Sequence, residues 1–85
     1  MYLKTYEVTN LFNGMVDTVL AYHLEDAMIH FLIDKFFPDF VRPYVREQIR
    51  TGGLSSVARI GTLYPNHLIY ESGGHVCEFE FVLKG

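Results

Sequence analysis

Residues 24–37, LEDAMIHFLIDKFF, form the longest stretch of the chain with the apolar spacing of a helix. Apolar side chains recur there every three or four positions: Leu24, Ala27, Met28, Phe31, Leu32 and Phe36. This spacing puts them along one side of a helix. Ile29, Ile33 and Phe37 widen that side, so the helix needs covering on more than one flank. Pro38 cannot continue it, and the pattern therefore predicts an end near Phe37.

A β-hairpin is predicted before this helix. Residues 2–12 and 15–22 flank an Asn-Gly pair at 13–14. Asn-Gly is the strongest short hairpin signal, because both residues tolerate positive φ. A two-residue turn would place Val8 opposite Val19, on a face of the hairpin that is mostly apolar.

A second helix is predicted after a short break at 38–39. It starts between Phe40 and Pro43 and runs to about Thr51, where two glycines end it. Its apolar side consists of four residues: Val41, Tyr44, Val45 and Ile49. These positions indicate a helix with one side packed against the rest of the protein.

The last third of the chain alternates as β-strands do. Three strands are predicted there: residues 54–64, 67–72 and 75–84. A tight Gly-Gly turn at 73–74 would pair Leu68 with Phe79. Apolar and polar residues alternate clearly across this turn, which is typical of a sheet with one buried face and one wet face.

The predicted order of elements is therefore ββααβββ, in one domain that spans residues 1–85. Strands on either side of paired helices indicate an α+β fold. We expect an antiparallel sheet of about five strands, with both helices packed on one of its faces.

Composition and charge narrow the classes of function. Apolar residues make up 49% of the chain, so it is not disordered by composition. The net charge is −3, from seven Lys and Arg against ten Asp and Glu, which argues against direct nucleic-acid binding. Cys77 is the single cysteine, which excludes an intrachain disulfide and suits a reducing compartment. The sequence has no apolar signal core and no membrane-length apolar run, so we expect a cytoplasmic protein.

Two groups of residues resemble parts of a catalytic or metal site. Asp26, His30 and Asp34 recur at four-residue spacing on the first helix. The carboxylates of Asp26 and Asp34 would lie roughly 12 Å apart, which is too far for both to bind one ion. A metal ion could therefore be bound only by two neighbouring members of this group, together with ligands from elsewhere in the chain. We favour a solvent-exposed polar edge instead.

His75 and Cys77 form an H-x-C pair, but Cys77 falls in the predicted buried row and is expected to be a core residue. We therefore expect no catalytic residue, no metal and no cofactor.

The hairpin tip is a candidate partner-binding surface. Leu11 and Phe12 precede the Asn-Gly turn, while Met15 and Val16 follow it. Apolar residues at a projecting tip need a cover, which a partner or a second copy of the chain can provide. The alternative is that the hairpin curls over the helices and buries these residues itself.

Two charged sets are further candidates for partner binding. Arg42, Arg46 and Arg50 form a stripe on the second helix, suited to phosphates or to an acidic partner. The alternative interpretation of this stripe is a solvated helix face on which Glu47 is an ion-pair partner. On the predicted wet face of the sheet, the acidic residues form a row: Glu71, Glu78 and Glu80. Such a row can imitate spaced phosphates, or it can be an ordinary polar sheet face.

The segment 21–27, AYHLEDA, joins the hairpin to the first helix, whose start is marked by acidic residues and an alanine. This pattern is similar to many small phage and plasmid accessory proteins. In size, acidity and lack of a catalytic motif, the whole chain resembles anti-CRISPR and anti-restriction proteins. The resemblance implies an inhibitor that binds a nucleic-acid-processing complex of the host.

Three functional hypotheses follow from these observations. The first is a non-enzymatic protein-binding module, with a protein partner and an inhibitory role of the anti-CRISPR type. The second is a structural or regulatory homodimer that associates through the N-terminal hairpin. The third is a small metal-dependent enzyme that uses residues from four positions: Asp26, His30, His75 and Cys77.

Overall fold

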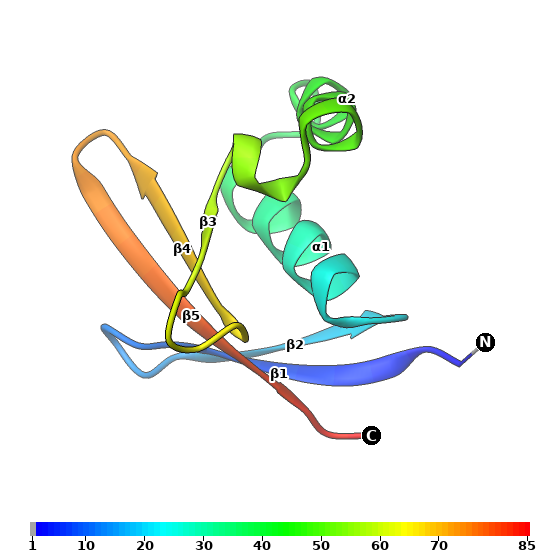
Figure 1. Ribbon diagram of the computed structural model, residues 1–85, viewed down its shortest axis with the longest axis vertical. Coiled ribbons are helices and arrows are strands. Elements are labelled where there is room, and N and C mark those ends of the chain that lie inside the picture. The colour runs from blue at the N-terminus through cyan, green and yellow to red at the C-terminus, as the bar shows by residue number, and fades with distance from the viewer. Residues whose placement is uncertain (1) are drawn as a thin grey trace.

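The structure is a computed structural model that describes residues 2–85, and it confirms the α+β fold predicted from the sequence (Figure 1). Its elements are β1 (Lys4–Asn10), β2 (Val16–Ala21), α1 (Leu24–Phe36), α2 (Arg42–Gly52), the 3-10 turn η1 (Leu54–Ser56), β3 (Arg59–Ile60), β4 (His67–Ser72) and β5 (His75–Leu83). The five strands form one antiparallel sheet in the order β2-β1-β5-β4-β3. The described chain begins just before β1 and ends just after β5, which is the central strand and pairs with β1.

The core lies between α1 and one face of the sheet. The Phe31 ring of α1 contacts two rings of β5, with centroid distances of 4.8 Å to Phe79 and 5.7 Å to Phe81. Both pairs have the edge-to-face geometry that aromatic rings prefer. Leu32 and Ile33 are fully buried beside them. Each such side chain contributes about 1.5–3 kcal/mol through burial, so this layer is the main source of stability.

Side-chain hydrogen bonds define the start of α1. His23 is the N-cap, and its Nδ1 accepts a hydrogen bond of 3.1 Å from the backbone N–H of Asp26. Asp26 reaches back, since its Oδ2 accepts from the backbone N–H of Tyr22 at 3.1 Å. This reciprocal arrangement satisfies N–H groups that lack partners at a helix start. The helix ends at Phe36 with Phe37 as its C-cap, as the sequence predicts.

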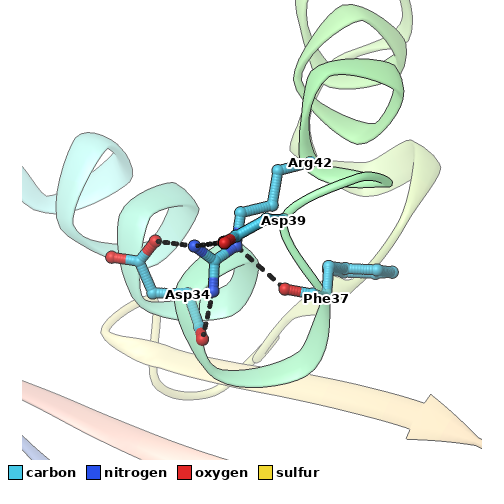
Figure 2. Close-up of polar contacts among 4 residues, drawn as sticks. All are labelled: Asp34, Phe37, Asp39 and Arg42. Atoms are coloured by element: carbon cyan, nitrogen blue, oxygen red, sulfur yellow. Dashed lines mark hydrogen bonds and ion pairs between the residues drawn. The ribbon is translucent and has the colours of Figure 1, made fainter.

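Arg42 fastens the joint between the two helices (Figure 2). Its Nε donates to the carbonyl oxygen of Phe37 at 2.9 Å, and its Nη2 donates to that of Asp34 at 3.1 Å. Its Nη1 donates to Oδ1 of Asp39 at 2.6 Å. The last carbonyls of a helix have no partner within the helix. Arg42 therefore satisfies the end of α1 with a charge of the sign that the helix dipole favours.

The second helix lies beyond the C-terminal end of α1, on the side away from β1 and β2 (Figure 1). It begins at Arg42 with Pro43 in its first turn, and it ends where Gly53 adopts a φ of 81°. Its buried side chains, Val45 and Ile49, join the core, and it packs against α1 and η1. Neither α1 nor α2, the long helices among residues 2–85, has the length and apolarity needed to cross a membrane.

The two hairpin turns differ in how well the sequence predicts them. Gly73 and Gly74 both have positive φ, and Leu68 pairs with Phe79 as predicted. The Asn-Gly turn is different, because Val8 pairs with Asp17 and not with Val19. The prediction of a two-residue turn is therefore wrong, and the register of β1 and β2 differs from the predicted register by two residues. A shift by an even number leaves each side chain on its original face, so the predicted apolar face is retained.

The predicted strand at residues 54–64 is also wrong in extent, because only Arg59–Ile60 pairs with β4. The preceding residues form η1, which lets Leu54 be buried. The loop that follows folds back on β4, since Gly61 N–H donates to the carbonyl of His67 at 2.9 Å. A Cβ at Gly61 would lie 2.7 Å from the carbonyl oxygen of Tyr64. The close approach of backbone at this glycine ends the strand.

The hydrogen bonds that Arg42 forms between the two helices lead to a testable prediction. Replacing Arg42 with alanine removes hydrogen bonds to carbonyls at the end of α1, so we expect a loss of about 1–2 kcal/mol in the free energy of unfolding. Arg46→Ala is the matched control, because Arg46 is exposed and has no ion-pair partner among residues 2–85; it should change stability by less than about 0.5 kcal/mol. Urea denaturation measures both. Equal effects of the two substitutions would contradict the structural role of Arg42.

Candidate functional site

The tip of the β1–β2 hairpin is a four-residue loop, residues 11–14, held by the side chains of two asparagines. Asn10 Oδ1 accepts hydrogen bonds from the backbone N–H of Phe12 at 2.9 Å and of Asn13 at 3.3 Å. Asn13 Oδ1 accepts from the N–H of Met15 at 2.9 Å. Only Gly14 adopts positive φ, whereas a two-residue type I′ turn would also need it at Asn13. The Asn10 side chain therefore explains the longer turn and the shifted register.

Three large apolar side chains are exposed at this tip. Their exposed fractions are 44% for Leu11, 69% for Phe12 and 62% for Met15. We call these three residues the tip patch. In Figure 1 the tip projects past the helices and does not curl over them. Leu11 is anchored through its N–H, which donates to the carbonyl of Glu78 in β5 at 2.9 Å. The chain thus presents an ordered apolar patch that it does not cover itself.

The acidic row separates into two parts. Glu78 Oε2 lies 2.6 Å from Nδ1 of His67, and Glu80 Oε2 lies 3.5 Å from Nε2 of the same ring. His67 is only 8% exposed, because the Tyr64 ring stacks on it at a centroid distance of 4.8 Å. The two glutamates therefore link β5 to His67 at the start of β4, and the Tyr64 ring packs the preceding loop on the same histidine. Glu71 belongs to no such cluster and is exposed near the Gly-Gly turn.

The arginine stripe is also divided. Arg42 forms its bonds within the helix joint. Arg50 Nε donates to Glu47 Oε2 at 2.9 Å; this pairing lowers the pKa of Glu47 and raises the pKa of Arg50. Arg46 alone of the three has no ion-pair partner within the described chain. The intrachain pairing with Glu47 that was the alternative for this stripe is confirmed for Arg50.

The residues of the enzyme hypothesis do not gather at one place. Asp26 lies 3.0 Å from Nε2 of His30 but also serves the cap of α1. Cys77 is half-buried against the core, while His75 is exposed at the Gly-Gly turn. Within residues 2–85, no three His, Cys, Asp or Glu side chains are grouped so that they can hold a metal ion. What remains at α1 is one carboxylate–histidine pair.

Sequence reasoning missed two structural histidines, His23 and His67. His23 caps α1, although histidine is not among the residues usually favoured at that position. The predicted alternation of β4 and β5 did place His67 on the same face as Glu78 and Glu80. The cover provided by Tyr64 was not detectable, because it depends on how the loop 61–66 folds back.

The tip loop yields a prediction about its order. Asn10→Ala removes the acceptor of two backbone N–H groups, so we expect a loss of about 1 kcal/mol in unfolding free energy and faster amide exchange in the loop. Asn10→Asp keeps an acceptor oxygen at the same place and should retain most of the protection. Hydrogen exchange followed by NMR distinguishes the two variants. Equal protection in the parent and in Asn10→Ala would show that this side chain does not order the tip.

The chain was also compared with known proteins. No protein-family model, no curated protein sequence and no solved structure matches it.

Proposed function

We propose that this chain is a non-enzymatic protein-binding module that binds a protein partner through the tip patch, Leu11, Phe12 and Met15. The observation that carries the proposal is the exposure of these three side chains on a loop with fixed geometry. Aromatic residues and methionine are enriched at the centres of protein interfaces, where they lose contact with water. A loop that is ordered before binding also loses less conformational entropy when it binds.

The charged residues contribute less to this proposal than the tip does. Arg42, Arg50 and Glu78 already have partners in the chain, so binding through them would first break those contacts. Arg46 and Glu71 are exposed and suit the polar rim of an interface. Rim charges mainly influence the rate of association and its salt dependence.

The proposed partner is a nucleic-acid-processing complex of a host cell, which the chain inhibits in its cytoplasm. The support is the net charge of −3 together with the resemblance in size and acidity to anti-CRISPR and anti-restriction proteins. Complexes that handle nucleic acid carry basic surfaces, and an acidic protein is attracted to them at low salt. This attraction steers the encounter, while the apolar tip supplies the affinity.

Capture from a host lysate tests the proposal. The tagged chain is used as bait, and bound proteins are identified by mass spectrometry. Phe12→Ala should weaken capture roughly tenfold or more if the ring is an interface anchor. Phe40→Ala is the matched control, because Phe40 is 78% exposed but lies between the two helices. It should leave capture unchanged.

A further variant tests the acidic row. Glu71→Lys reverses an exposed charge outside the His67 contacts, so it should reduce only the association rate, and less so at high salt. Circular dichroism checks that every variant is folded. If Phe12→Ala and the parent capture the same partner equally well, the tip patch is not its binding site.

A further inference from the structure

Strand β2 leaves one complete edge of the sheet uncovered. Asn10, at the end of β1, donates its N–H to the carbonyl of Met15, which directly precedes β2, whereas the N–H of the next residue, Leu11, donates to the carbonyl of Glu78 in β5. Because the bonding direction alternates along a strand, the register turns the backbone groups of three β2 residues outward: Val16, Thr18 and Leu20. Each of these residues presents an N–H donor and a C=O acceptor beyond the edge of the sheet.

The two edges of the sheet differ in how they are protected. The opposite edge, β3, has only two residues, of which one is the charged Arg59. Short strands and charged side chains are usual means of preventing edge-to-edge pairing. β2 has six residues and contains neither proline nor lysine, and Val16 and Leu20 are 54% and 59% exposed. Its length and composition favour pairing with another strand.

The space beside this edge is open on the helix side. A groove of about 590 Å³ lies between β2 and α1, and Asp17 of β2 and Phe31 of α1 are among the residues that line it. The groove lies where α1 packs beside β2. The groove carries both signs of charge, since Lys35 Nζ lies 3.9 Å from Asp17 Oδ2 and Asp34 is beside it. A surface with both signs can face a second copy of itself without a net repulsion.

We propose that β2 pairs antiparallel with β2 of a second copy of this chain, about a two-fold axis through Thr18. The partner strand would extend the sheet continuously through both copies. The residues of β2 favour this axis over the two neighbouring axes. An axis at Asp17 would place two like charges directly opposite each other, which is unfavourable. An axis at Val19 would pair Val16 with Tyr22, but the N–H of Tyr22 is already bonded to Asp26.

The Thr18 axis uses the outward groups of β2 fully. Thr18 meets its own copy, and Val16 meets Leu20 of the second copy twice. Three outward residues on each of two strands, each donating one N–H, give six hydrogen bonds. The two tip patches then lie at opposite ends of the paired strands and stay accessible. This inference goes beyond the proposed partner binding and does not depend on it.

Disulfide trapping in a Cys77→Ser background tests the register. In a hydrogen-bonded antiparallel pair the Cα atoms are about 5.5 Å apart, which a disulfide can span. Thr18→Cys should therefore form a cross-linked dimer under mild oxidation. In the same register the Val19 positions are diagonal, with Cα atoms about 7–8 Å apart, and Val19→Cys should cross-link far less. Preferential cross-linking of Val19→Cys would overturn the proposal.

Sedimentation equilibrium tests the association without a cross-link. The parent should approach twice the chain mass of 9.8 kDa as its concentration rises. Thr18→Pro removes an outward N–H without removing a β1–β2 bond, so it should give a folded monomer. Leu20→Lys, a milder change, should also give a monomer if the proline variant does not fold. Phe12→Ala should remain dimeric. A parent that is monomeric at every concentration overturns the proposal, whatever the tip patch binds.

Discussion

The burial of α1 against the sheet is the constraint on which the rest of the structure depends. Phe31 lies against Phe79 and Phe81, and the neighbouring Leu32 and Ile33 have no exposed surface. A chain of 85 residues has apolar residues for one such layer and little more. The sheet is therefore covered on one face only. The open face, the β2 edge and the hairpin tip remain available for binding, and the core keeps them in fixed relative positions.

The features predicted correctly from the sequence are those with a local cause. The wide apolar side of residues 24–37 requires a packed helix, and Pro38 ends it. Two consecutive glycines supply both positive φ angles of a tight turn, so the pairing of Leu68 with Phe79 follows from the sequence. The Asn-Gly signal failed because Asn10 bonds to the backbone of Phe12 and Asn13 and stabilises a longer loop. A rule based on the two turn residues does not include this third side chain.

The features that were not predictable depend on segments distant in sequence. The charge pattern placed Arg42 in a candidate binding stripe of three arginines, but its partners include carbonyls at the end of another helix. Likewise, Glu78 appeared as a surface charge, although it contacts His67 beneath Tyr64. The exposed tip could be anticipated, because apolar residues beside a turn have few neighbours. The position of the tip relative to the helices depends on how the whole hairpin folds, which the sequence pattern does not show.

The central claim is that the α1-backed sheet offers β2 as a strand edge for association, and amide exchange at single residues tests it most directly. The N–H groups of Asp17 and Val19 point to β1 and should be protected at every protein concentration. Those of Val16, Thr18 and Leu20 point outward, and they should exchange fast in dilute protein and become protected as concentration rises. Fast exchange of these three amides at all concentrations, with Asp17 and Val19 protected, would contradict the account.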